Sequence, residues 1–315
     1  MLSSARPEGQ SFLLVIGGPT GAGKTELAIQ LYLRHGWPIL SADSRQIYRY
    51  LDIGTNKVSQ ALQAQVPHFL IDICWPDEPY SAGAFVQEVE GLLGRWKGLP
   101  VVQVVGGTGF YLEALLYGLD PVPPIPPEVR AQAEKWLAEV GLGAASAWLK
   151  ATDPLTAQRI DLHNPRRVLR AVEVLWATGR PWASFWREGG RERRYPALVV
   201  VLSQPREILY KRIAQRTRQQ IAAGWLEETR FVLEKGYSPT AAGLQTLGYR
   251  ECLQVLAGQR SHTTLTEAVI QANRHYARRQ LTWWRNHAWD LWLEESSLPR
   301  LCTTIEEAIA KQLST

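Results

Sequence analysis

The first half of the chain alternates short runs of apolar, largely β-branched residues with longer segments whose apolar positions recur at helical spacing. The short runs predict buried strands, and the longer segments predict amphipathic helices. The predicted strands are residues 12–16, 38–40, 69–73, 101–105 and 198–202. Helical patterns such as residues 26–33 and 84–96 lie between the first four strands. Because strands and helices alternate, the sequence predicts an α/β fold with a doubly wound parallel sheet and helices on both of its faces.

A proline-rich segment interrupts this alternation. Residues 120–127 (DPVPPIPP) contain five prolines, which exclude a helix or a central strand there. Further helical patterns follow it and precede the fifth strand, at residues 128–140, 144–151 and 166–178. We therefore predict a first part of the core at residues 1–122, an inserted helical domain at 123–195, and a return to the core at 196–315. The last part continues into predicted C-terminal helices at residues 206–223, 225–234, 249–256 and 266–284.

The composition is that of a globular protein. The chain has 315 residues, of which 45% are hydrophobic and 21% are charged. No apolar run approaches the roughly 18 residues that cross a bilayer, and no signal-peptide pattern is present, so we expect a cytoplasmic protein without a membrane partner. The cysteines Cys74, Cys252 and Cys302 follow neither a disulfide framework nor a zinc-binding spacing. We expect a monomer.

Positive charge is concentrated in the second half of the chain. Residues 150–290 hold 23 Lys and Arg against 12 Asp and Glu, whereas residues 1–149 hold 10 against 14. Arginines outnumber lysines by 27 to 8, and arginine is the better residue for bidentate phosphate contacts and for stacking on bases. The excess of arginine alone fits a compositional bias, but its clustering favours an anionic partner.

A phosphate-binding loop follows the first predicted strand. The segment GPTGAGKT matches the pattern of two glycines five residues apart followed by Lys and Ser/Thr, and a helix follows it. Its backbone N–H groups and the helix N-terminus attract an anion, Lys24 reaches terminal phosphates, and the hydroxyl of Thr25 suits Mg²⁺. The predicted phosphate-binding residues are Gly18, Pro19, Thr20, Gly21, Ala22, Gly23, Lys24 and Thr25.

Polar residues at two other strand ends face the same edge of the predicted sheet. Asp43 follows the second strand in SADSRQIY, where a carboxylate serves as a general base, a metal ligand or a helix N-cap. Thr108 lies within GGTG after the fourth strand, where it either binds substrate or belongs to a tight turn. Asp72 falls inside its predicted strand, so no strand ends in the metal-binding Asp of an ATP-hydrolysing motor.

Two segments of the basic half combine arginines with helical spacing. In HNPRRVLRAVEV, Arg166 and Arg170 share a helix face, with Arg167 next to them. In NRHYARRQLTWWR, arginines are interleaved with His, Tyr and paired Trp, a combination that suits a phosphate backbone with unstacked bases nearby. The alternative for each is a solvated helix face, and many of the 13 tryptophans are needed for packing.

Taken together, these motifs resemble the tRNA dimethylallyltransferases (tRNA isopentenyltransferases) of bacterial type. The shared segments are GPTGAGKT, ADSRQIYRYLDIGTNK, HFLIDI, YSAGAF, GGTGFYLEALLYGL, NPRRVLRAVEV, GLQTLGYRE and ARRQLTWWR, over roughly residues 14–286. The resemblance implies that the loop binds dimethylallyl diphosphate and that the acceptor is the adenosine 3′-adjacent to the anticodon, in tRNAs that read codons beginning with U. The expected products are isopentenyladenosine and diphosphate.

The resemblance also implies roles for particular residues. Asp43 would accept the proton of the amine, Thr25 would hold Mg²⁺, and Lys24 with Arg216 would neutralise the diphosphate. The implied tRNA contacts are Asp43, Ser44, Arg45, Gln46, Thr108, Arg130, Arg166, Arg167, Arg170, Gln245, Gly248, Tyr249, Arg250, Arg278, Arg279, Gln280, Trp283 and Arg285.

Alternative functions remain open at this point. An adenylate isopentenyltransferase acting on AMP, ADP or ATP would share the amino-terminal motifs but has little use for the basic half. The phosphate-binding loop alone also permits a nucleotide kinase or an ATP-driven RNA-binding protein. The basic half alone permits an RNA-binding module without catalysis.

Overall fold

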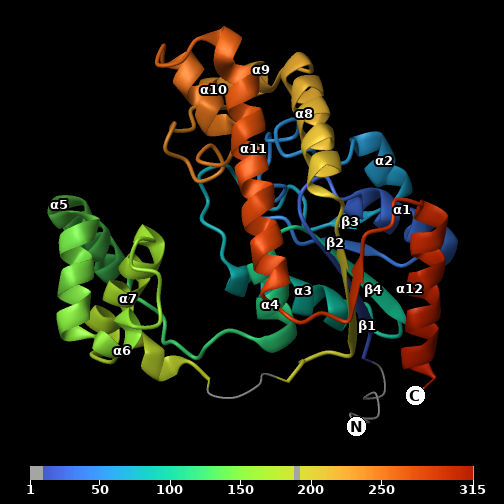
Figure 1. Ribbon diagram of the computed structural model, residues 1–315, viewed down its shortest axis with the longest axis horizontal. Coiled ribbons are helices and arrows are strands. Elements are labelled where there is room, and N and C mark those ends of the chain that lie inside the picture. Colours follow the sequence, from blue (N-terminus) through green and yellow to red (C-terminus); the bar gives the residue numbers. More distant parts are fainter. Residues whose placement is uncertain (1–9, 188–191, 315) are drawn as a thin grey trace. The chain divides into compact units, whose positions relative to one another are not determined.

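The computed structural model describes residues 10–187 and 192–314 (Figure 1). The predicted core and insertion segments also include residues 1–9, 188–191 and 315, which lie outside the described residues. The described chain divides into two compact units, one of residues 1–117 and 193–315 and the other of residues 118–192. None of the described helices is long and apolar enough to cross a bilayer.

The larger unit is built on a parallel six-stranded sheet, which confirms the predicted fold class. Its strands are β1 (Phe12–Gly17), β2 (Ile39–Ser41), β3 (His68–Phe69), β4 (Val101–Val105), β5 (Ala197–Leu202) and β6 (Leu291–Leu293). They lie in the order β3-β2-β4-β1-β5-β6, and every neighbouring pair is parallel. From β1, the strands β4, β2 and β3 extend to one side and β5 and β6 to the other, as in doubly wound folds. The carboxyl ends of the strands therefore form one edge of the sheet, where ligands bind in such folds.

Successive residues of the buried strands face opposite layers of helices. Leu14 and Ile16 of β1 pack with α1 (Lys24–His35) and α12 (Leu298–Leu313), which lie side by side (Figure 1). Leu13 and Val15 face α3 (Ala82–Arg95) and α4 (Gly109–Tyr117) instead. The central strands are therefore apolar at nearly every position; the exception in β4 is the buried Gln103, whose amide donates to the carbonyls of Ala28 and Trp37.

One predicted strand was too long, and several elements of the structure were not predicted. The predicted strand at residues 69–73 ends at Phe69, because Leu70 and Asp72 adopt left-handed φ angles of 64° and 55° that break the ladder. Asp72 is therefore outside the strand. The short strand β6 and the helices α2 (Gln60–Gln65), α4 and α12 were not predicted. Helix α4 is apolar on all sides and begins in the glycines of GGTG, so it shows no amphipathic period.

The C-terminal helices build a further core beside the sheet. They are α8 (Arg206–Ala222), α9 (Trp225–Glu234), α10 (Tyr249–Leu256) and α11 (His262–Arg285). Trp225 and Tyr249 are almost fully buried in this core, where they contact the loop after β2. Helix α11 runs beside α8 (Figure 1).

Three tryptophan rings lie directly against glycine backbone. Trp284 covers Gly17 at the end of β1, and Trp283 covers Gly109 at the start of α4. Trp225 covers Gly54 in the same way. A Cβ atom at any of these glycines would overlap the ring, so the close approach of α11 and α9 requires glycine there.

The smaller unit is helical. It contains α5 (Pro127–Thr152), α6 (Pro154–Ala157), α7 (Pro165–Thr178) and a 3₁₀ turn at Trp182–Phe185. The two helices predicted before residue 152 form one element that kinks at Gly141, where φ is 77°. Trp136, Trp148 and Trp176 pack edge to face between α5 and α7.

Candidate active site

The phosphate-binding loop connects β1 to α1 with three of its glycines at positive φ angles. Gly18 and Gly23 have φ angles of 136° and 97°, which favour glycine. A side chain at Gly18 would also overlap the carbonyl of Leu202 on the neighbouring strand. The loop thus presents its backbone at the amino end of α1, where a helix attracts anions.

Lys24 lies over this loop and is half-buried. Its Nζ donates to the carbonyl oxygens of Gly18 and Pro19 at 3.0 and 2.8 Å. Burial lowers the pKa of Lys24 to about 8, the charge of Asp43 opposes that shift, and Arg216 adds to it. These backbone acceptors therefore hold the ammonium group of Lys24 at the loop, where it is placed to bind an anion.

Two arginines of α8 approach the loop from its other side. Arg216 donates to Oγ1 of Thr20 at 2.5 Å, and Arg212 donates to the carbonyl of Gly21 at 3.2 Å. Burial lowers the pKa of Arg216, and Asp43 is the main group that opposes this. The Nε–H of Arg216 is buried and has no partner among the described residues, so it remains available to an acceptor such as a phosphate oxygen.

Asp43 lies on a turn after β2 and does not cap a helix. Its Oδ1 accepts from the backbone N–H of Arg45 at 2.9 Å. The turn is fixed by Thr108, whose Oγ1 accepts from the N–H of Ser44 at 3.1 Å and lies 3.3 Å from its hydroxyl. Thr108 therefore supports the turn that carries Asp43, a role that the sequence left open between turn and substrate contact.

One cavity of about 720 Å³ brings these groups together within the larger unit. Lys24, Thr25, Asp43, Arg212 and Arg216 all line it. The charge of Asp43 opposes the lowering of the pKa of both Lys24 and Arg216, and all three side chains line this cavity. An anion bound at the loop would thus share the cavity with a proton acceptor.

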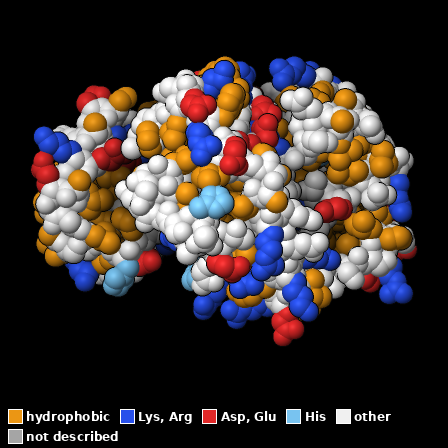
Figure 2. Space-filling view, turned by 90° about the horizontal axis from the view of Figure 1, so that it is seen from above, with side chains coloured by type: hydrophobic (Ala, Val, Ile, Leu, Met, Phe, Trp, Pro, Cys, Tyr) orange, Lys and Arg blue, Asp and Glu red, His pale blue; other side chains and the backbone are white. Residues whose placement is uncertain are grey.

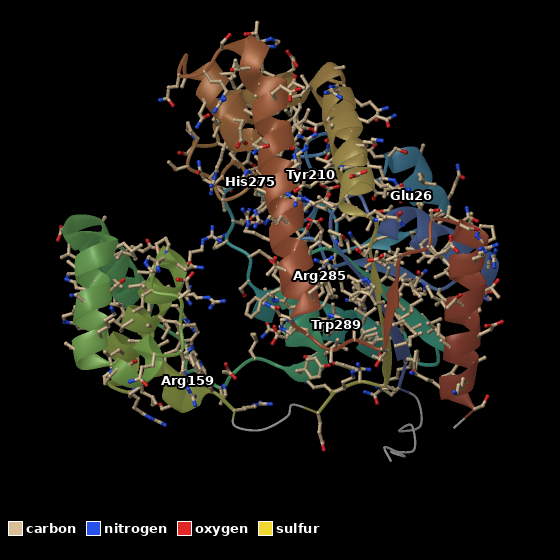
Figure 3. The ribbon with its side chains drawn as sticks, in the orientation of Figure 1. Glu26, Arg159, Tyr210, His275, Arg285 and Trp289 are labelled. Carbon is tan, nitrogen blue, oxygen red and sulfur yellow. The ribbon has the colours of Figure 1, made fainter. Side chains whose placement is uncertain are left out.

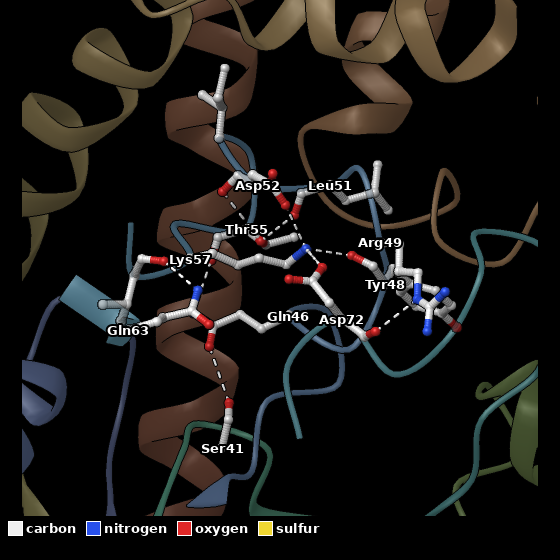
Figure 4. A network of polar contacts seen from close by, with 12 residues as sticks. Ser41, Gln46, Tyr48, Arg49, Leu51, Asp52, Thr55, Lys57, Gln63 and Asp72 are labelled. Atoms are coloured by element: carbon white, nitrogen blue, oxygen red, sulfur yellow. Dashed lines mark hydrogen bonds and ion pairs between the residues drawn. The ribbon is translucent and has the colours of Figure 1, made fainter. Parts of the chain in front are cut away.

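A polar network under the loop of residues 52–57 forms one wall of the cavity (Figure 4). Lys57 is buried and its Nζ bonds to the carbonyl of Tyr48 and to carboxylates of Asp52 and Asp72, at 2.5, 2.7 and 2.5 Å. Gln46 accepts from the hydroxyl of Ser41 at 3.1 Å and donates to carbonyls of the loop. The side chain of Gln46 is thus held in the lining of the cavity that also contains Asp43, by bonds at both ends of its amide.

The loop of residues 52–57 is also bound by the carboxylate of Glu228 on α9. Oε2 accepts the N–H groups of Asp52 and Ile53 at 2.8 and 2.7 Å. Oε1 accepts the N–H of Gly54 at 3.1 Å and the hydroxyl of Tyr249 at 2.6 Å. Four donors around one carboxylate fix the cavity wall to the C-terminal helices.

Three cavity-lining residues of α11 occupy one helix face: Asn273, Tyr276 and Gln280. The guanidinium of Arg45 lies 4.2 Å from the centre of the Tyr276 ring. Burial raises the pKa of Tyr276, against the charge of Arg45. The sequence analysis assigned only Gln280 of the three, although their spacing of three and four residues was a visible helical signal.

The residues predicted to contact tRNA between positions 245 and 285 fall into two groups. Gln245, Arg250, Arg278, Arg279 and Arg285 are exposed, the last at the carboxyl end of α11 (Figure 3). The second group faces inward and consists of Gly248, Tyr249, Gln280 and the half-buried Trp283. Tyr249 has no exposed surface to offer an RNA, because it binds Glu228 and packs against Trp225.

Basic and acidic side chains are mixed on the face of the molecule that Figure 2 shows. In the helical unit, Arg130, Arg166 and Arg167 are exposed, while Arg170 is partly covered and pairs with Glu173 at 3.1 Å. The prediction of tRNA contacts from these four residues stays a prediction.

The residues around Thr25 suit a magnesium ion that is shared with a diphosphate. The Thr25 hydroxyl is exposed in the cavity wall, and Asp43 supplies a carboxylate to the same space. No cluster of three or more metal-ligating His, Cys, Asp or Glu side chains occurs in the described ranges. Magnesium binding at Thr25 stays a prediction.

Comparison with known proteins identifies the family. A family model described as IPP transferase matches residues 46–287, and a second, described as isopentenyl transferase, matches residues 11–72. The chain belongs to the IPP transferase family. It is 40% identical to a tRNA dimethylallyltransferase of Synechococcus sp. (strain JA-3-3Ab), over 93% of this chain and 83% of that protein. A tRNA dimethylallyltransferase of Geobacillus kaustophilus is 39% identical, over 93% of each chain.

Solved structures agree with this membership. The crystal structure of a tRNA isopentenylpyrophosphate transferase from Bacillus halodurans superimposes with a TM-score of 0.70 at 30% identity, covering 97% of each chain. A eukaryotic dimethylallyltransferase described as acting on tRNA gives a TM-score of 0.73 at 25% identity, over 87% of this chain and 69% of that one.

Proposed function

We propose that this protein transfers the dimethylallyl group of dimethylallyl diphosphate to the exocyclic 6-amino group of the adenosine 3′-adjacent to the anticodon. The substrates are tRNAs that read codons beginning with U, and the products are isopentenyladenosine and diphosphate. The observation that carries the proposal is the shared cavity, in which the phosphate-binding loop with Lys24 and Arg216 faces Asp43. The names of its relatives support the choice of tRNA as acceptor.

In this mechanism, Asp43 accepts the proton that the amine loses as its nitrogen bonds to the allylic carbon. Its Oδ1 is oriented by the N–H of Arg45, which leaves Oδ2 for the amine. The adenine must leave its stack to reach the cavity, at a cost of a few kcal/mol, which is lowest in a single-stranded loop.

The carbon–oxygen bond to the diphosphate breaks in the same step, and negative charge grows on the leaving group. Lys24 and Arg216 stabilise that charge from two sides, and Arg212 lies beside them as a further donor. Thr25 would hold Mg²⁺, which supplies additional charge neutralisation to the diphosphate oxygens when it is bound.

The proposal includes a cytoplasmic location, where tRNA is used, and a monomer. A monomer suffices because the proposed groups around the cavity all come from one chain. The exposed arginines of α11 and of the helical unit would bind the tRNA backbone.

The test is transfer of label from radioactive dimethylallyl diphosphate to unmodified tRNA in the presence of Mg²⁺. We expect labelled isopentenyladenosine in the digested tRNA, and at least about 100-fold slower labelling with Asp43→Asn. Equal labelling of free AMP would favour an adenylate isopentenyltransferase. Phosphate release from ATP that RNA stimulates, without any label in tRNA, would favour an ATP-driven protein.

A further inference from the structure

Gln280 is the one predicted tRNA contact of α11 whose side chain makes two bonds into the active-site loops. It is buried, with 7% of its surface exposed, while its neighbours Arg278 and Arg279 are exposed. Its Oε1 accepts the backbone N–H of Thr20 at 2.9 Å, and its Nε2 donates to the carbonyl of Gly107 at 2.9 Å. Both ends of the amide are therefore engaged by backbone, and neither is directed at a solvent-borne RNA.

These two hydrogen bonds connect the loop proposed to bind the diphosphate with the segment that supports the Asp43 turn. Thr20 belongs to the phosphate-binding loop, and its hydroxyl accepts from Arg216. Gly107 immediately precedes Thr108, whose Oγ1 accepts the backbone N–H of Ser44 in the turn that carries Asp43. The backbone N–H of Thr108 also donates to the carbonyl of Ala42 at 3.3 Å. The amide of Gln280 thus spans the gap between the diphosphate cradle and the turn that carries the proton acceptor.

The fit around the amide is close. A Cβ atom added to Gly107 would overlap Nε2 of Gln280, while it would lie at an ordinary 3.5 Å from the carbonyl of Gly18. Gly107 has no left-handed φ angle, so an alanine there would meet the amide of Gln280, which would have to shift, and would not strain the backbone. Gly107 and Gln280 therefore act as a pair that sets the spacing of the two loops.

We propose that Gln280 is a positioning residue for prenyl transfer, which fixes the distance between the diphosphate-binding loop and the Asp43 turn, and not a tRNA contact. This inference rests on the proposed function. Transfer requires the nitrogen and the allylic carbon to approach within about 3–3.5 Å in line, and a displacement of about 1 Å costs on the order of 10²-fold in rate. Loss of either bond frees one loop to shift relative to the other.

The decisive experiment compares Gln280→Met with the unchanged protein in prenyl transfer to tRNA. Methionine has a similar length and keeps the packing but makes neither hydrogen bond. We expect kcat to fall by roughly 10- to 100-fold, with the KM for tRNA and the salt dependence of tRNA binding unchanged within about threefold. A raised KM for tRNA with an unchanged kcat would overturn the proposal in favour of a direct RNA contact, and unchanged kinetics would also overturn it.

The matched control is Gln271→Met on the same helix. Gln271 is exposed and its amide contacts only His275 among the described residues, at 2.8 Å, so its kinetics should match those of the unchanged protein. If the unchanged protein transfers no prenyl group, the proposed function fails. If it does and Gln280→Met transfers equally well, only the role of Gln280 fails.

A double substitution covers the case in which Gln280→Met folds poorly. Gly107→Ala should lower kcat on its own, because its methyl group displaces the glutamine amide. Combined with Gln280→Ala, which removes the clashing atoms, the alanine at 107 should cause no further loss in kcat. Equal losses from Gly107→Ala in both backgrounds would show that the two residues act independently and would contradict the proposal.

Discussion

Glu228 gives the sharpest prediction about stability, because one carboxylate accepts four hydrogen bonds from the cavity wall. Each of its oxygens receives two donors: the N–H groups of Asp52 and Ile53 on one, and the N–H of Gly54 and the hydroxyl of Tyr249 on the other. In Glu228→Gln, the NH₂ group must face one of these donor pairs, whichever way the amide turns. Two bonds to a charged acceptor are then lost.

Bonds to charged groups contribute about 1.5–3 kcal/mol each, and water reaches part of this loop, so we expect a loss of about 2–4 kcal/mol in the local stability of residues 52–54. Tyr249→Phe removes a single donor and should cost about 1–1.5 kcal/mol. Glu227→Gln, at the exposed neighbouring position, is the matched control and should stay within about 0.5 kcal/mol.

Hydrogen–deuterium exchange of the peptide that contains Asp52 to Gly54 measures this directly. A loss of about 2 kcal/mol corresponds to roughly 30-fold faster amide exchange, because each 1.4 kcal/mol is a factor of ten. Exchange in Glu228→Gln that is no faster than in Tyr249→Phe would refute the reasoning, since the backbone donors would then contribute nothing.

Three further predictions concern the chemistry and the tRNA. Asp43→Asn should lower the single-turnover rate by ~10²- to 10⁴-fold with little change in tRNA affinity. A rate near that of the unchanged protein would exclude Asp43 as the general base. Because the pKa of Lys24 is about 8, its charge is present below that pH and lost above it, so calorimetry should find inorganic diphosphate binding about tenfold weaker at pH 9 than at pH 7. In Lys24→Arg the same series should be nearly flat, and an equal fall would assign the pH dependence to another group. Arg278→Ala and Arg285→Ala should each reduce the slope of log affinity against log salt by about one, measured by filter binding; unchanged slopes would exclude phosphate contacts there.

The sequence predicted the sheet and the phosphate-binding loop because both are local patterns. Buried parallel strands are continuous apolar runs, and the loop glycines have fixed spacing, so β1, β4 and β5 were predicted within a residue or two. The strand at 69–73 failed because an apolar run does not reveal the left-handed φ angles of Leu70 and Asp72. Apolar content alone cannot distinguish such a bend from a strand.

Site residues were harder to predict when their role depends on contacts distant in sequence. The buried position of Gln280 follows from its bonds to residues 260 and 173 positions away, which no local pattern encodes. The anchoring role of Glu228 likewise depends on a loop 174–176 positions away. By contrast, Lys24 begins the helix after β1 and Asp43 follows β2, so the topology of the sheet brings them to the same edge.

The rings of Trp283 and Trp284 against Gly109 and Gly17 have a consequence for how the protein tolerates change. Flat, stiff side chains on bare backbone act as spacers of fixed thickness, so together with the aliphatic contacts of Leu281 they set the register of the arginine-bearing helix against the strands. Enlarging either glycine, or shrinking either indole, would tilt the whole helix and move every charge it carries. We expect such positions to accept substitutions only in compensating pairs.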